Sequence, residues 1–125
     1  MQDEPAPLAV LDAAIGHLRD NVLGKLDARG QFEMRVTISA LSLVRRTLAL
    51  TPHSDAAELK RLRDLLGEEG DLASLNTSLC DRIRDGGVDL KTPGLFAHLY
   101  KTAVEKLAVD QPNYSAYKRA LAQES

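Results

Sequence analysis

The sequence has little cysteine and no long apolar segment, and each scarcity excludes a class of protein. Cys80 is the only cysteine among 125 residues, so an internal disulfide is excluded and a reducing cytoplasm is expected. No apolar run approaches the roughly 20 residues that span a bilayer. The acidic start, Met1-Gln-Asp-Glu-Pro5, lacks the basic and apolar regions of a signal peptide. We therefore expect a cytoplasmic protein that does not contact membranes.

An excess of positive charge is also missing. The 16 Lys and Arg residues are outnumbered by 18 Asp and Glu residues, giving a net charge of -2. A dedicated nucleic-acid-binding protein would carry a clear basic excess, so nucleic acid is not an expected partner. The hydrophobic share of 44% and the charged share of 27% are those of an ordinary globular protein. The length suits one domain over 1–125, with residues 1–6 and 122–125 as flexible ends.

Apolar residues recur at steps of three and four throughout, which predicts helices, and no segment alternates as a strand would. We predict an all-α fold, a single-domain bundle of five to six helices with short connections. The expected helices cover 7–27, 32–50, 55–66, 71–85, 92–111 and 113–121.

Glycine, proline and small polar residues mark the predicted helix ends. Gly30 is expected to stop the first helix, and Pro52 to separate the second from the third. Four start signals follow: the capping box Asp55 with Glu58, Asp71, Thr92-Pro93 and Asn113. Gly86-Gly87 is expected to end the fourth helix, and Pro112 the fifth.

The second helix is apolar on two sides. One stripe is Phe32, Val36, Ala40 and Leu43, and a nearly opposite one is Met34, Ile38, Leu41, Val44 and Leu48. Such a helix is usually packed between neighbours, so we expect it at the centre of the bundle. The same pattern leaves a homodimer open, because one stripe could pack against a second copy.

Two later helices have one apolar face each. The fourth helix is expected to bury Leu72, Leu75, Leu79 and Ile83, with Cys80 half-buried beside them. The fifth is expected to bury Phe96, Leu99, Tyr100, Ala103 and Leu107, which places His98 on its polar, solvated side. The charged run Lys60-Arg61-Leu62-Arg63-Asp64 is interpreted as a solvated face.

No arrangement of residues typical of catalysis, cofactor binding or metal binding is visible. His17, His53 and His98 do not pair with another ligand at helical spacing, so they are interpreted as surface histidines. Gly67-Glu-Glu-Gly70 lacks the lysine and hydroxyl of a phosphate-binding loop. We expect no catalytic residue, no cofactor and no metal.

Seven residues are candidates for interaction or anion contact. Arg35, Ser39, Ser42 and Arg46 form the one polar stripe of the second helix, with the arginines about 16 Å apart at 1.5 Å per residue. This stripe could bind an anion or a partner's carboxylates, or it could be the solvent-facing edge of a buried helix. Asn76 lies close to an apolar face, where it could bridge helices or contact a ligand. Tyr114 and Tyr117 could clamp the last helix or form an interface.

Three segments together resemble one family of small bacterial helical proteins that is classed as a domain of unknown function. They are Gly70-Asp-Leu-Ala-Ser-Leu-Asn-Thr-Ser-Leu-Cys80, Glu105-Lys-Leu-Ala-Val-Asp-Gln-Pro112 and Asn113-Tyr-Ser-Ala-Tyr-Lys-Arg119. Members lie beside genes for acyl-CoA dehydrogenases and for kinases that resemble aminoglycoside phosphotransferases. The resemblance implies an accessory subunit in acyl-CoA catabolism, similar to one that works with a hydroxyacyl-CoA kinase. It supplies no catalytic residue to carry over.

The sequence leaves three possible functions to be tested. The first is a non-enzymatic accessory protein that binds such a kinase or an acyl-CoA dehydrogenase. The second is a bundle that binds an acyl-CoA or another small molecule, with Arg35 and Arg46 contacting its phosphates. The third is an enzyme whose catalytic residues are distant in sequence and converge only in the fold.

Overall fold

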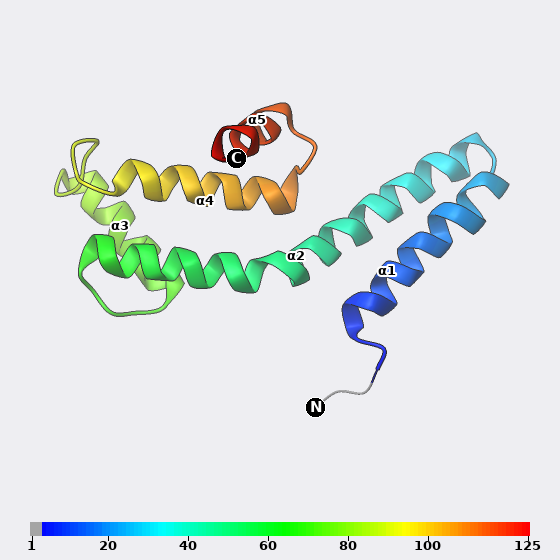
Figure 1. Cartoon of the computed structure of the whole chain (residues 1–125), viewed down its shortest axis with the longest axis horizontal. Helices are drawn as coiled ribbons and strands as arrows, with labels where there is room; N and C mark the ends of the chain where they lie inside the picture. The colour runs from blue at the N-terminus through cyan, green and yellow to red at the C-terminus, as the bar shows by residue number, and fades with distance from the viewer. Residues whose placement is uncertain (1–3) are drawn as a thin grey trace. The chain divides into compact units, whose positions relative to one another are not determined.

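A computed structural model describes residues 4–125, so residues 1–3 of the expected flexible start lie outside the described part. The all-α prediction is confirmed: residues 4–125 contain five α-helices and no strand (Figure 1). Contacts divide the chain into two compact units, Met1–Leu50 and Thr51–Ser125, which are described in turn. One domain over 1–125 stays a prediction.

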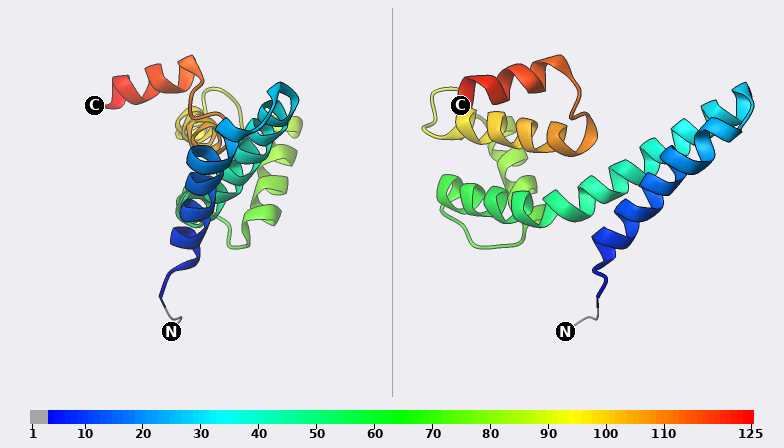
Figure 2. Two further views of the ribbon diagram at one scale, coloured as in Figure 1. Left: turned by 90° about the vertical axis from the view of Figure 1, so that its right-hand side faces the viewer. Right: turned by 45° about the vertical axis from the view of Figure 1, so that its right-hand side comes forward.

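The first unit holds α1, Pro7–His17, and the first part of α2, Ala28–Leu66. After α1 the helix loosens into a π-helical turn, Leu18–Val22, and then tightens into a 3₁₀ turn, Leu23–Lys25. The two helices run beside each other in both views of Figure 2. An ion pair joins them, with Arg45 Nε 2.9 Å from Asp12 Oδ1.

Gly30 does not stop a helix, which corrects the sequence prediction. The Gly30 amide donates to Asp27 Oδ1 at 2.8 Å, so Asp27 caps α2 and Gly30 lies in its first turn. A side-chain acceptor just before the helix outweighs the weak helix preference of one glycine.

Pro52 does not break α2, and this prediction was also wrong. The helix runs unbroken from Ala28 to Leu66 with Pro52 inside, so Asp55 and Glu58 are interior residues and not a capping box. A proline removes one backbone donor from a helix. Each part of α2 makes contacts within its own unit, namely the Arg45 ion pair before the proline and the buried Leu62 after it.

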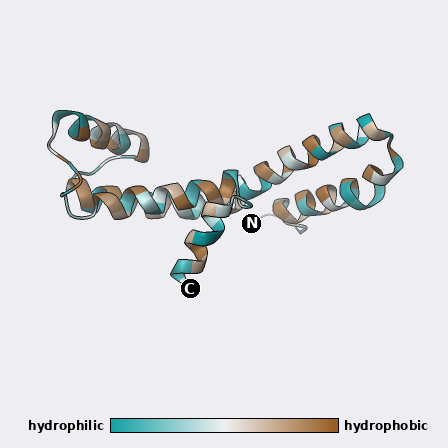
Figure 3. Ribbon diagram, turned by 90° about the horizontal axis from the view of Figure 1, so that it is seen from above, coloured by the Kyte–Doolittle hydropathy of each residue, from teal (hydrophilic) through white to brown (hydrophobic). Residues whose placement is uncertain are grey.

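The two apolar stripes of α2 differ in exposure. Apolar residues recur along the whole helix (Figure 3), but Phe32 and Val36 of the first stripe are 67% and 55% exposed. Ala40 and Leu43 are exposed as well, so the first stripe is not packed against a neighbour, contrary to expectation. In the second stripe Met34, Ile38 and Leu41 are half-buried, and Val44 and Leu48 are exposed.

The second unit has a leucine-rich core between α2, α3, Leu72–Asp85, and α4, Leu95–Asp110. Its buried residues are Leu62, Leu66, Leu75, Leu79, Val88 and Leu95. Asp71 caps α3 as predicted, accepting a hydrogen bond of 2.7 Å from the Ser74 amide. Gly86 follows at φ 84°, a left-handed conformation that favours glycine and ends the helix.

The predicted inward face of α3 holds for its leucines but not at its edge. Ile83 is 43% exposed, and Cys80 is exposed and not half-buried. Both lie off the face that buries Leu75 and Leu79.

The two last helices begin later than predicted. Thr92 Oγ1 accepts from the Asp89 amide in the preceding loop, and α4 starts after Gly94, which has φ 90°. The last helix, α5, is Ser115–Glu124, so it includes residues 122–124. Tyr114 precedes it and makes no side-chain cap, so Asn113 is not the cap that was predicted. The predicted end of α4 before Pro112 is confirmed.

Candidate functional site

The buried side of α4 combines Leu95 of the core with polar residues, and the stripe that the sequence predicted to be buried is a different one. His98 is 3% exposed and is the buried polar residue of the described part of the chain. One and two helical turns further on, Thr102 and Glu105 are half-buried on the same side. Arg61 of α2 reaches them: its Nη1 and Nη2 donate to Glu105 Oε1 and Oε2 at 3.0 and 2.7 Å. Its Nη2 also donates to Thr102 Oγ1 at 3.2 Å.

The Arg61–Glu105 ion pair explains why the hydrophobic periodicity of the sequence wrongly predicted which residues are buried. Hydrophobic periodicity assumes that apolar side chains face inward. Arg61 was assigned to a solvated charged run, yet 19% of its side chain is exposed because Glu105 compensates its charge. The one available signal was the spacing of His98, Thr102 and Glu105, which places three polar groups on one side of a helix.

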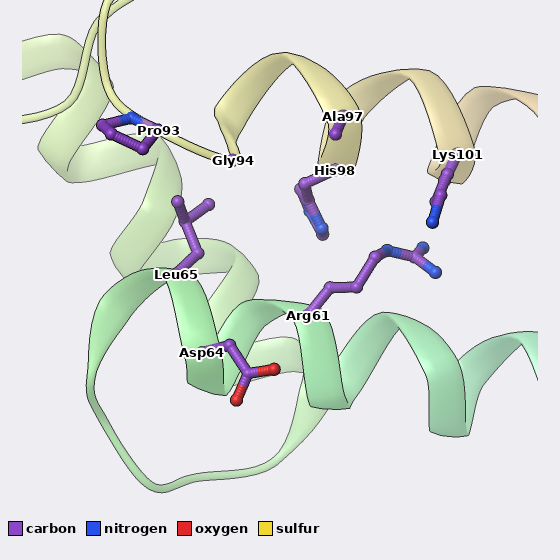
Figure 4. A pocket seen from close by; sticks show the side chains of 8 residues that line it. All are labelled: Arg61, Asp64, Leu65, Pro93, Gly94, Ala97, His98 and Lys101. Atoms are coloured by element: carbon purple, nitrogen blue, oxygen red, sulfur yellow. The ribbon is translucent and has the colours of Figure 1, made fainter.

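A pocket of about 260 Å³ opens beside this ion pair, within the second unit. Figure 4 shows the His98 ring pointing from α4 toward the space above α2, with the Arg61 side chain rising from α2 beside it. The lining residues are Arg61, Asp64, Leu65, Pro93, Gly94, Ala97, His98 and Lys101.

Burial determines the charge of His98. It lowers the pKa of the imidazole, and the positive charge of Arg61 lowers this pKa further. The carboxylates of Glu58 and Glu105 oppose the shift without reversing it. The imidazole is therefore neutral at pH 7. Two buried nitrogens in this region, His98 Nδ1 and Arg61 Nε, have no hydrogen-bond partner in the structure.

The apolar side of α4 is exposed instead of buried. Phe96, Leu99 and Tyr100 are 70%, 45% and 38% exposed, and we call these three residues the Phe96 face. The rings of Phe96 and Tyr100 stack at 6.2 Å with an interplanar angle of 21°. Ala103 is exposed and Leu107 half-buried, so the predicted burial of this stripe was wrong.

The polar stripe of α2 stays together on one helix of the first unit. Arg35 and Ser39 are exposed, and Ser42 and Arg46 are half-buried. Arg35 Nη2 donates to Gln31 Oε1 at 3.3 Å, one turn earlier on the same helix. These four residues keep the geometry expected from their spacing, and their role as an anion or partner contact stays a prediction.

Asn76 bridges two helices. Its Nδ2 donates to Glu58 Oε1 on α2 at 2.9 Å and to the Leu72 carbonyl at 3.1 Å. This bond joins α3 to α2, which is the structural role that was considered for Asn76. A ligand contact at Asn76 stays a prediction.

The two C-terminal tyrosines differ in position. Tyr114 is 50% exposed just before α5. Tyr117 is half-buried and lines a second pocket of about 260 Å³ between α4 and α5, together with Tyr100 of the Phe96 face. The structure thus brings Tyr117 near Tyr100 within the second unit. The choice between clamp and interface stays open for both tyrosines.

The other predicted surface histidines are exposed: His17 near the end of α1 and His53 inside α2. Within residues 4–125, no three His, Cys, Asp or Glu side chains gather to hold a metal ion. In the same residues no helix is both long and apolar enough to cross a membrane.

Comparison with known proteins identifies the family of this chain. No curated protein and no solved structure matches the chain. A family model described as "Domain of unknown function (DUF6285)" matches residues 24–114, which include α2, α3 and α4 and hence the pocket and the Phe96 face. Because this match covers well over half of the sequence, the chain belongs to the DUF6285 family.

Proposed function

We propose that this chain is a non-enzymatic accessory protein of acyl-CoA catabolism in the bacterial cytoplasm. Its partner is a kinase that resembles aminoglycoside phosphotransferases and acts on hydroxyacyl-CoA. An acyl-CoA dehydrogenase encoded nearby is the alternative partner. In this proposal the kinase holds the nucleotide and carries out the chemistry, and the small helical protein binds it.

The observation that carries the proposal is the Phe96 face. Three large apolar side chains, two of them aromatic, lie exposed on one side of α4 while a polar side of the same helix is buried. Exposing them to water is unfavourable. Aromatic residues are also enriched at the centres of protein interfaces, where they contribute most of the binding energy. A protein partner would remove this surface from water.

The choice of partner rests on the family resemblance. The segments that resemble the family lie in α3, at the end of α4 and at the start of α5, and the family match spans the first two completely. Genes of this family accompany those for the kinase and the dehydrogenase, which makes these two enzymes the partners to test. The exposed aromatic surface supports a protein contact, and the gene context supplies its identity.

The test is purification of the chain together with each enzyme encoded beside it. Size-exclusion chromatography should give one co-migrating complex with the kinase. Phosphorylation of a hydroxyacyl-CoA should then fall when the small protein is omitted. Separate migration of the two proteins, with full kinase activity in the absence of the small one, would contradict the proposal. A complex with the dehydrogenase alone would select the alternative partner.

A further inference from the structure

The pocket between α2 and α4 contains a hydrogen-bond donor without an acceptor. Arg61 uses both terminal nitrogens on Glu105 and Thr102, but its Nε is buried and has no partner. A guanidinium nitrogen can only donate a hydrogen bond. An unpaired buried donor is unfavourable, so an acceptor that reached Arg61 Nε from the pocket would be stabilised.

His98 provides a second unpaired nitrogen in the same pocket. The residue is 3% exposed, its ring points into the space between the helices (Figure 4), and its Nδ1 has no partner. A neutral imidazole carries its proton on one nitrogen and can place it on Nδ1. His98 Nδ1–H would then be a second donor for an acceptor that enters the pocket.

Lys101 and the start of α4 bring positive charge to the rim of the pocket, which the Asp64 carboxylate also lines. Lys101 is exposed at its rim and forms no ion pair with the described residues. The first turn of the 16-residue helix α4 also lines it, through Gly94 and Ala97. The Leu95 amide donates to the Thr92 carbonyl at 3.2 Å, and Gly94 provides no side-chain cap for the amides that follow it, at the positive end of the helix dipole.

The neighbouring carboxylates are engaged elsewhere. Asp64 accepts from Lys60 Nζ at 2.8 Å, and Glu105 holds the two terminal nitrogens of Arg61. Glu58 accepts from Asn76. These acidic groups therefore do not supply the acceptor that Arg61 Nε and His98 Nδ1 lack.

We infer that this pocket binds a small oxyanion, a carboxylate or phosphate group on a small molecule, between Arg61, His98, Lys101 and the first turn of α4. The remaining wall is apolar and consists of Leu65, Pro93 and Ala97. A volume of about 260 Å³ suits a small ligand with a short apolar body. This site is separate from the Phe96 face and does not depend on the proposed partner.

The test is a titration of the purified full chain with inorganic phosphate and, separately, with acetate, at constant ionic strength. Nuclear magnetic resonance follows the His98 ring and the Ala97 and Lys101 amides. At least one of the two anions should give saturable shifts of these signals. The anion that binds more tightly identifies the group, phosphate or carboxylate, that the pocket accepts.

Two matched lysine variants test whether the anion binds in this pocket. Lys101→Met should weaken binding about tenfold, as expected for a charge-assisted hydrogen bond. Lys106→Met removes an equally exposed lysine of α4 that does not line the pocket, and it should leave the affinity unchanged. The inference is overturned if neither anion gives saturable shifts, or if both variants weaken binding equally. Both lysines are exposed, so either variant should fold.

Discussion

Arg61 on α2 and Glu105 on α4 form a two-point ion pair in which each terminal nitrogen of the guanidinium donates to a different carboxylate oxygen, at 3.0 and 2.7 Å. The side chains are 19% and 26% exposed, so water screens the pair only partly. Together with the buried Leu95, the paired geometry holds α4 against α2. In this orientation the Phe96 face of α4 is exposed.

Removing one partner of this pair should destabilise the second unit. Glu105→Ala leaves the half-buried Arg61 charge without its carboxylate and with Thr102 Oγ1 as its remaining acceptor, which should lower the free energy of unfolding by about 1.5–3 kcal/mol. Glu124→Ala removes an exposed carboxylate of α5 and should have little effect. Urea denaturation followed by circular dichroism measures both. Equal midpoints for the two variants would mean that the pair does not hold α4 in place.

His98 should make stability depend on pH. Its pKa is lowered in the folded state because the ring is buried beside Arg61, while in the unfolded chain it is about 6.5. The unfolded state therefore binds more protons as the pH falls below about 6.5, so the free energy of unfolding should fall with it. This contribution is complete above the unfolded pKa and is lost as the pH drops through the folded pKa.

The measurement is the urea midpoint as a function of pH, for the wild type and two histidine variants. His98→Asn should flatten the dependence below about pH 6.5. His53→Asn, at an exposed position inside α2, should keep the wild-type slope. A wild-type slope in the His98 variant would show that the buried ring is not its source.

The core should respond strongly to the loss of one leucine. Leu62 is fully buried, with 0% exposure, among the other core residues of the second unit. Leu62→Ala should therefore destabilise the protein by about 2–5 kcal/mol, through lost burial and the cavity that remains. Leu90→Ala makes the same change where the side chain is 86% exposed, and should leave the denaturation midpoint nearly unchanged. A comparable loss of stability in both variants would show that Leu62 does not belong to the core.

The continuity of α2 can be tested with two aspartates. Asp71 accepts a hydrogen bond from the Ser74 amide at the start of α3, so Asp71→Ala should lower the melting temperature. Asp55 lies inside α2, where it does not cap a helix. Asp55→Ala should therefore leave the melting temperature unchanged. A matching loss in the Asp55 variant would indicate that a helix begins there, as the sequence had suggested.

Local signals predicted much of the fold. The Asp71 cap, the glycine after α3 and the end of α4 before Pro112 depend on a few neighbouring residues, and each is found as expected. The prediction failed at Pro52, which normally interrupts a helix, whereas α2 continues through it from Ala28 to Leu66.

The candidate site was less accessible to sequence reasoning. The burial of His98 depends on Arg61 pairing with Glu105 across 44 positions, and helical periodicity contains no information on such a pair. The same contact turned the predicted buried stripe of α4 into the exposed Phe96 face. Asn76 was identified because an amide beside leucines needs a partner, although its partner Glu58 could not be named.

We propose that the Phe96 face binds the kinase, and calorimetric titration of the chain into the purified kinase measures this contact. Two variants make the same substitution at nearly equal exposure, Phe96→Ser at 70% and Phe32→Ser at 67%. We expect Phe96→Ser to weaken binding by at least about 2 kcal/mol, roughly thirtyfold, as at an interface hot spot. Phe32→Ser should bind like the wild type. Wild-type affinity in the Phe96 variant, or a selective loss in the Phe32 variant, would contradict the claim.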